Sequence, residues 1–232
     1  GCARKARLTR QTPAAYHDKG LPSEGAAGPY MGKSKRVIAV VGTYRKRGVI
    51  DSAVEEILSS AQEQGAEVSR IYLTDARIEF CTNCRACTRQ EGRSRGRCPL
   101  PDDMEHILES IEQADAVVLA SPVNFGTVTA VMKRFIERLV CYAYWPWGAA
   151  VPKIRTKETP RKAVVVVSSA APAFLARIGS RAAVLLRQAA GLLGASTTGV
   201  LFIGMAARRE HQGIGSGVRK KARRLGRKLA DA

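Results

Sequence analysis

The sequence predicts an α/β protein with a doubly wound parallel sheet of five strands and helices on both faces. Two observations lead to this prediction. From residue 36 onward, short apolar stretches alternate with longer stretches whose apolar residues recur at helical spacing. The short stretches are apolar throughout, which is typical of parallel strands buried on both faces. Right-handed crossovers between the strands are therefore expected.

The individual elements follow from this pattern in chain order. Five apolar stretches are predicted to be strands, at residues 37–41, 68–73, 116–120, 163–167 and 198–203. Five stretches with an apolar stripe are predicted to be helices, at residues 50–64, 102–111, 131–140, 174–193 and 218–229. Gly65 closes the first helix, and Asp102 and Asp103 open the second, because acidic residues favour the first turn of a helix.

The chain divides into a leader and one folded domain. Residues 1–35 are predicted to be a flexible basic leader without sustained periodicity. Met31 stands just before the first strand and is a candidate start, so residues 1–30 need not be native to the domain. Residues 36–232 are expected to form the domain, with a cysteine-rich insertion at 76–100 and an aromatic segment at 141–160. This segment is expected to be a subunit contact, with a lid over a ligand as the alternative.

Composition and charge exclude several classes of protein. The formal net charge is +18, but much of the excess lies at residues 1–36 and 207–232. Two solvated basic ends are the simpler interpretation, and a nucleic-acid partner is the less favoured one. The chain has no apolar run long enough to span a membrane and no secretory pattern at its start, so a cytoplasmic protein without a membrane partner is expected. The three histidines lie far apart in sequence, which disfavours histidine-based hydrolysis.

The segments that follow the strands are the candidate ligand site, because ligands of such sheets bind at the carboxyl ends of the strands. Residues 42–52, after the first strand, combine hydroxyls, three consecutive cations and a helix N-terminus, which suits a phosphate group. The segment lacks both the Walker pattern and the three spaced glycines of dinucleotide sites, so the phosphate of a mononucleotide is favoured over ATP or a dinucleotide. An ordinary basic turn is the alternative. Residues 121–129 can place backbone amides against a flat ring, and Ser168 and Ser169 leave room for a ligand edge.

These segments resemble those of the flavodoxin-like NAD(P)H-dependent FMN reductase family. The resemblance rests on the Gly-Thr-x-Arg loop at residues 42–45, on Ser-Pro-Val-x-Phe-Gly at 121–126, and on Lys133, Phe135, Ile136 and Arg138. It covers residues 36–205 and implies the flavodoxin-like strand order 2-1-3-4-5. It also implies that the FMN phosphate faces Thr43, Arg45, Asp51 and Ser52. The flavin ring would then face Pro122, Val123, Asn124, Phe125 and Gly126, with Ser168 and Ser169 nearby.

Four of the six cysteines are concentrated in one short segment. The candidate metal ligands are Cys81, Cys84, Cys87 and Cys98, and Pro99 follows the last of them. Three cysteines at two-residue gaps, a more distant fourth and a following proline are similar to bacterial ferredoxin motifs and favour a 4Fe-4S cluster. A zinc site, and free thiols or a redox disulfide, remain the alternatives. The motif also resembles that of the iron–sulfur flavoproteins, a branch of the same flavodoxin-like group.

Together these features predict an FMN-dependent oxidoreductase. Electrons would pass from NAD(P)H through FMN, with the 4Fe-4S cluster as a further carrier, to a flavin, quinone or other acceptor, which can be a small molecule or a protein. The family implies a homodimer or homotetramer. One alternative is a ferredoxin-linked electron carrier without NAD(P)H activity. A second is a basic module that binds nucleic acid or a partner on a flavodoxin-like scaffold.

Overall fold

The computed structural model describes residues 34–155, 158, 160–210 and 212–231. The chain separates into two units, Gly1–Gly32 and Lys33–Ala232, and the description below concerns the second unit only. Nearly all of the expected basic leader at residues 1–35 therefore lies outside the described residues. Among the described residues, no helix is both long and apolar enough to cross a membrane.

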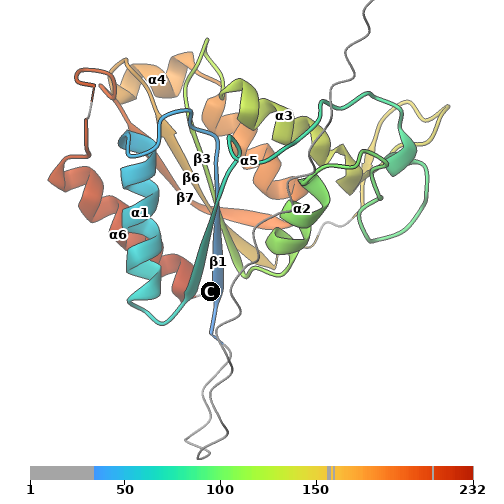
Figure 1. The fold of residues 1–232 in the computed structure, drawn as a ribbon, viewed down its shortest axis with the longest axis horizontal. Helices are drawn as coiled ribbons and strands as arrows, with labels where there is room; N and C mark the ends of the chain where they lie inside the picture. The colour runs from blue at the N-terminus through green and yellow to red at the C-terminus, as the bar shows by residue number, and fades with distance from the viewer. Residues whose placement is uncertain (1–33, 156–157, 159, 211, 232) are drawn as a thin grey trace, which may run out of the picture. The chain divides into compact units, whose positions relative to one another are not determined.

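A parallel sheet of five strands forms the centre of the unit (Figure 1). Its strands, in chain order, are β1 (Arg36–Val41), β2 (Glu67–Tyr72), β3 (Ala116–Pro122), β6 (Arg161–Ser168) and β7 (Ala195–Ile203). They are arranged in the order β2-β1-β3-β6-β7, which confirms the predicted order. The numbering skips two strands because β4 (Ala143–Tyr144) and β5 (Lys153–Ile154) form a separate antiparallel pair within the aromatic segment.

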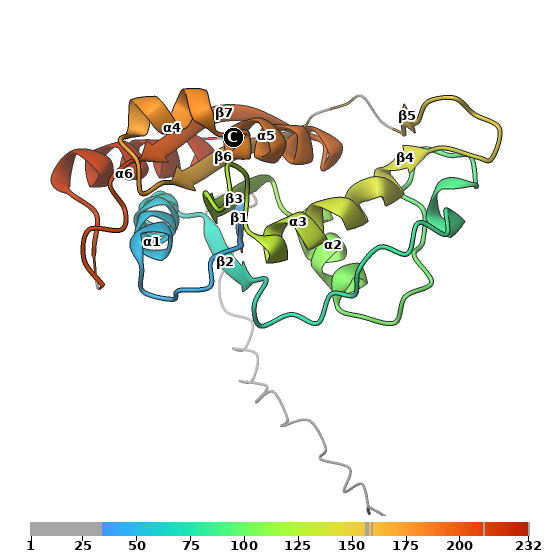
Figure 2. The same ribbon diagram turned by 90° about the horizontal axis from the view of Figure 1, so that it is seen from above.

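Helices cover both faces of the sheet (Figures 1 and 2). One face carries α1 (Val49–Gln62) and α6 (Ser216–Ala230), and the other carries α2 (Met104–Glu112), α3 (Ala130–Arg138) and α5 (Ala182–Leu192). The packing of strand β1 explains why its sequence is apolar throughout. Val37, Ala39 and Val41 pack with α1 and α6, whereas Ile38 and Val40 pack with the helices of the opposite face. Both faces are thus buried, as the sequence predicts.

The prediction of one helix over residues 174–193 is wrong. The segment forms two helices, α4 (Ala173–Gly179) and α5 (Ala182–Leu192). Ser180 between them is extended, with φ −123° and ψ 145°, and the amide of Arg181 donates to the carbonyl of Gly126 at 2.8 Å. Glycine and serine are weak helix formers, so the tertiary hydrogen bond to the segment after β3 fixes the break there.

Thr129 joins the segments that follow β1 and β3. It is fully buried, and its hydroxyl donates to the Gly42 carbonyl at 2.6 Å and accepts from the Met132 amide at 3.3 Å, which caps α3. Its own amide donates to the hydroxyl of Ser121 at 3.1 Å. One side chain therefore fixes the relative positions of two strand ends and a helix start.

Replacing Thr129 with valine is expected to lower the free energy of unfolding by about 1–2 kcal/mol, because the helix loses its cap and a buried carbonyl loses its donor. Urea denaturation followed by circular dichroism would measure the change. Thr74→Val is the matched control, because the Thr74 side chain is exposed and contacts only Asp75, at 3.4 Å. Equal stability of the Thr129 variant and the wild type would contradict the prediction.

Candidate functional site

A cavity of about 340 Å³ opens at the carboxyl ends of β1, β3 and β6. We call it the strand-end cavity. Seven of the predicted site residues line it: Thr43, Arg45, Pro122, Val123, Asn124, Ser168 and Ser169. Tyr44, Gly48, Val49 and Ile50, which also line it, lie in the predicted segment 42–52, and Ala170 follows Ser169, whereas Ala206 and Ala207 after β7 were not predicted. Its volume lies within the range typical of small-molecule sites, and four sequence-distant segments, at residues 43–50, 122–124, 168–170 and 206–207, converge on it.

One end of the strand-end cavity is suited to an anion. Gly48, Val49 and Ile50 line it, so the N-terminus of α1 faces the cavity. The N-cap residue Gly48 makes no side-chain capping bond, which leaves the first helical amides available to a ligand. Arg45 adds a full positive charge beside them. Its guanidinium donates to the carbonyl of Glu210 at 3.1 Å, which ties the loop after β1 to the segment after β7.

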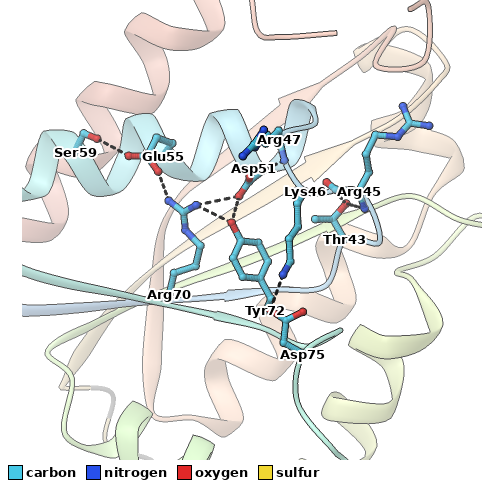
Figure 3. A network of polar contacts seen from close by, with 10 residues as sticks. All are labelled: Thr43, Arg45, Lys46, Arg47, Asp51, Glu55, Ser59, Arg70, Tyr72 and Asp75. Carbon is cyan, nitrogen blue, oxygen red and sulfur yellow. Dashed lines mark hydrogen bonds and ion pairs between the residues drawn. The ribbon is translucent and has the colours of Figure 1, made fainter. Parts of the chain in front are cut away.

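Asp51 has a different environment from the one that the family resemblance implies (Figure 3). It does not line the strand-end cavity, and neither does Ser52. Its carboxylate accepts from the Arg47 amide at 2.8 Å, from the Arg70 guanidinium at 3.0 Å and from the Tyr72 hydroxyl at 2.5 Å. Burial, followed by the hydrogen bond to Asp51, raises the pKa of Tyr72. Asp51 thus holds the loop after β1 in place from a position outside the strand-end cavity.

The three consecutive cations of this loop also separate in the structure. Arg45 lines the cavity, whereas Lys46 turns the other way and pairs with Asp75 at 2.7 Å (Figure 3). Arg47 has a positive φ of 60°, a backbone conformation that reverses the chain before α1. Only one of the three cations therefore faces a ligand in the cavity.

The other end of the strand-end cavity is built from backbone and small side chains. Val123 donates its amide to the carbonyl of Ser168 at 2.7 Å, which holds the segments after β3 and β6 together. Asn124 and Thr127 exchange two backbone hydrogen bonds around a turn whose middle residues, Phe125 and Gly126, both have positive φ. Asn124 lines the cavity, whereas Phe125 and Gly126 do not, and the Phe125 side chain is fully exposed. The result is a slot with small residues on one side and a fixed backbone on the other.

A second, larger cavity of about 480 Å³ lies beside residues 93–97 and the ends of α2 and α5. Its lining mixes cations and acids, and Arg95 pairs there with Glu105 at 2.8 Å and with Glu112 at 3.0 Å. Four arginines and three glutamates line this cavity, whereas Arg45 lines the strand-end cavity with no acidic residue beside it.

Residues 81–98, the cysteine loop, are folded against the aromatic segment. Arg85 has a φ of 58° and lies between two indole rings, 3.8 Å from the centre of Trp145 and 4.3 Å from that of Trp147. Arg155 donates to the carbonyls of Cys87, Gln90 and Cys141 at 2.8–3.1 Å. These contacts give the aromatic segment a structural role beside the cysteines that neither predicted alternative included.

The cysteines of this region influence one another electrostatically. Burial, followed by the nearby thiols of Cys98 and Cys81, raises the pKa of Cys87 to about 11. Burial, followed by Cys87, raises the pKa of Cys141 to about 12. Cys141 and Cys98 also line the same small cavity. Sequence reasoning gave no role to Cys141, and no local signal indicates one, because it lies 43 residues from Cys98 in the chain.

The cysteine loop fits an iron–sulfur cluster in its chemistry. Cys81, Cys84, Cys87 and Cys98 are all free thiols, as is Cys141. The guanidinium of Arg138 lies beside Cys98, and positive charge of this kind favours thiolates and an anionic cluster. Within the described part of the chain, no three His, Cys, Asp or Glu side chains are positioned to hold a single metal ion.

The sheet order defines a flavodoxin-like protein, and the strand-end cavity lies where ligands of such sheets bind. The chain belongs to the NADPH-dependent FMN reductase family, whose model matches residues 35–207. Its fold is similar to that of an NAD(P)H:quinone oxidoreductase from Methanothermobacter marburgensis, with a TM-score of 0.56 and 20% identity over 85% of this chain and 96% of that chain. It is also similar to an FMN-dependent NADH-azoreductase from Bacillus anthracis in complex with FMN, with a TM-score of 0.59 and 12% identity over 85% of this chain and 98% of that chain.

Two curated relatives resemble the chain more closely in sequence. An iron-sulfur flavoprotein from Archaeoglobus fulgidus is 33% identical over 111 residues, which is 48% of each chain. An iron-sulfur flavoprotein from Methanocaldococcus jannaschii is 35% identical over 103 residues, which is 44% of this chain and 51% of its own length. The chain thus spans about half the length of the curated relatives that it matches.

Proposed function

We propose that this protein binds FMN in the strand-end cavity and passes electrons from NAD(P)H through FMN to a flavin, a quinone or another acceptor. The observation that carries the proposal is the convergence of Arg45, the uncapped N-terminus of α1 and the segments after β3 and β6 on one cavity. Bound FMN supplies the hydride and electron chemistry, so no side-chain acid or base is required. The protein contributes position, charge and exclusion of water.

The residues of the cavity divide this work between its two ends. Arg45, Thr43 and the first amides of α1 hold the phosphate at one end. At the other end, the backbone of residues 122–124 would face the flavin ring, and the small side chains of Ser168 and Ser169 would leave room for it. Asp51 does not face the ligand and acts by fixing the loop that carries Arg45. The turn at Phe125 and Gly126 forms the rim of the cavity.

We further propose that Cys81, Cys84, Cys87 and Cys98 bind a 4Fe-4S cluster. Such a cluster exchanges single electrons, whereas a nicotinamide delivers a hydride, and a flavin can serve both partners. The curated relatives named iron-sulfur flavoprotein support this proposal, as does the packing of the cysteine loop against Trp145 and Arg155. The same features favour a second candidate function, a ferredoxin-linked electron carrier that does not use NAD(P)H.

Exposed apolar side chains after β3 and on α4 (Ala173–Gly179) support a homodimer or homotetramer, and a cytoplasmic location stays a prediction. Phe125, Phe174, Leu175 and Ile178 are all exposed, and apolar side chains of this kind are typical of subunit contacts. A nucleic-acid partner has less support. On the last helix, α6, Arg219 pairs with Glu56 of α1, and Arg223 pairs with Glu63, the residue that follows α1. Part of the positive charge of α6 is therefore used inside the fold.

Anaerobic absorption spectroscopy of the purified protein, with FMN, iron and sulfide assays on the same sample, tests the proposal. We expect flavin bands, a broad absorption from iron–sulfur charge transfer, about four irons per chain, and bleaching on addition of NADH or NADPH. Bleaching by reduced ferredoxin but by neither nicotinamide would favour the electron carrier. A protein that binds no FMN after reconstitution would contradict the proposed function.

A further inference from the structure

We infer that Arg138 is a positioning residue that hydrogen-bonds the sulfur of Cys98 and thereby raises the reduction potential of the cluster. The inference rests on the cluster proposed above. It concerns one residue of α3 that the family resemblance marks only as part of a sequence motif. Three features of the structure support it: the contact with sulfur, the rigid support of the guanidinium, and the burial of Arg138 and Asp102.

The contact with sulfur is direct. Nη2 of Arg138 lies 3.4 Å from Sγ of Cys98, within hydrogen-bonding distance for a sulfur acceptor. Arg138, Cys98 and Cys141 also line one small cavity, so the guanidinium and both sulfurs share an enclosed space. A guanidinium cannot lose its proton in a protein, so the donor is present at every accessible pH.

The guanidinium is held rigidly from the other side. Nη1 donates to Oδ2 of Asp102 at 2.5 Å and to the carbonyl of Glu79 at 2.8 Å, and Nη2 donates to Oδ1 of Asp102 at 3.2 Å. Asp102 is fixed in turn, because it accepts from the amides of Glu79 and Met104. The side chains of Arg138 and Asp102 are only 2% and 1% exposed. Two-point support of this kind orients the fork of arginine and is not available to lysine.

Asp102 remains ionised beside this arginine. Burial opposes its ionisation, but the hydrogen bonds from Arg138 and from the Glu79 amide outweigh burial and keep the pKa of Asp102 below its usual value. The pair therefore carries one positive and one negative charge, and the positive charge lies on the side of the sulfur.

The consequence for a bound cluster follows from charge balance. Reduction by one electron adds one negative charge to the cluster and its ligand sulfurs and breaks no bond to Cys98. A hydrogen bond to a ligand sulfur stabilises this added charge, and such bonds are among the factors that set cluster potentials. Arg138 therefore favours the reduced state, whereas the Asp102 charge opposes it.

Two variants with opposite expected signs test the inference. The double variant Arg138→Met, Asp102→Asn removes the donor without leaving a buried unpaired charge. We expect the equilibrium constant for reduction of its cluster to fall at least tenfold. For one electron, this corresponds to a reduction potential about 59 mV lower. Asp102→Asn alone keeps Arg138 and removes the opposing charge, so its potential is expected to rise. Anaerobic titration with dithionite, followed by electron paramagnetic resonance, measures both shifts.

Lys133→Met is the matched control. It removes one positive charge from the same helix, α3, but Lys133 is exposed and pairs with Glu137 at 2.9 Å. Its cluster potential and its flavin potential are expected to equal those of the wild type. The flavin potential also serves as an internal reference in every variant.

Iron and sulfide contents separate the possible failures. Unchanged cluster potentials in variants with full iron content would overturn the role of Arg138 and leave the proposed function intact. If the wild type holds no iron after anaerobic reconstitution, the proposed cluster fails and the inference fails with it. If the double variant does not fold, Asp102→Asn and Arg138→Lys decide the matter: the lysine variant keeps the charge without the fork and is expected to shift the potential downward.

Discussion

Replacing Gly96 with alanine is expected to weaken assembly of the cluster and to leave FMN binding unchanged. A Cβ at residue 96 would lie 1.6 Å from the carbonyl oxygen of Cys87 and 2.6 Å from its carbonyl carbon. These are backbone atoms, so no side-chain rotation can relieve the clash. The Gly96 amide is also fixed, because it donates to the carbonyl of Cys141 at 2.8 Å. The cysteine loop must therefore move, and Cys87 moves away from Cys98.

The measurement is the iron, sulfide and FMN content per chain after anaerobic reconstitution. We expect the affinity for iron to fall by about tenfold to a hundredfold, the range found when groups that orient metal ligands are changed. Gly191→Ala in α5 is the control, because a Cβ there meets nothing within 4 Å. Wild-type iron content in the Gly96 variant would show that the packing of Gly96 on Cys87 is not needed to hold the cluster.

Replacing Arg45 with alanine is expected to weaken FMN binding by about tenfold to a hundredfold, because a hydrogen bond to a charged group contributes about 1.5–3 kcal/mol. Arg45 is the only one of the three consecutive cations at residues 45–47 that lines the strand-end cavity. Lys46 instead pairs with Asp75, and Arg47 has the positive φ that reverses the chain before α1. The loss should therefore be specific to this residue and to the phosphate of the ligand.

Comparison of FMN with riboflavin isolates the phosphate contribution. Fluorescence titration of the apoprotein should show a large loss of FMN affinity in Arg45→Ala and little change in riboflavin affinity, because riboflavin has no phosphate. Lys46→Ala removes the same charge from the next residue and should leave both affinities close to those of the wild type. An equal loss for the two ligands would instead place Arg45 against the ring or in the structure of the loop.

The sequence by itself determined the sheet and the location of the site. Strands such as Val37–Val41 are apolar at every position, and only burial on both faces explains that pattern. The helices alternate with these strands, so a parallel sheet and its carboxyl-end site followed from local patterns alone. Seven predicted residues duly line one cavity, because short loops after adjacent strands must end at the same edge.

Only the tertiary structure decided which way individual side chains face. Asp51 turns to Arg70 and Tyr72, partners 19 and 21 residues away, and the positive φ of Phe125 places its ring in solvent. The break between α4 and α5 depends on a bond to Gly126, and the contact of Arg138 with Cys98 joins residues 40 positions apart. Periodicity reports which face of an element is buried. It carries no information about single backbone dihedral angles or about contacts between distant segments, and these fix the chemistry of the site.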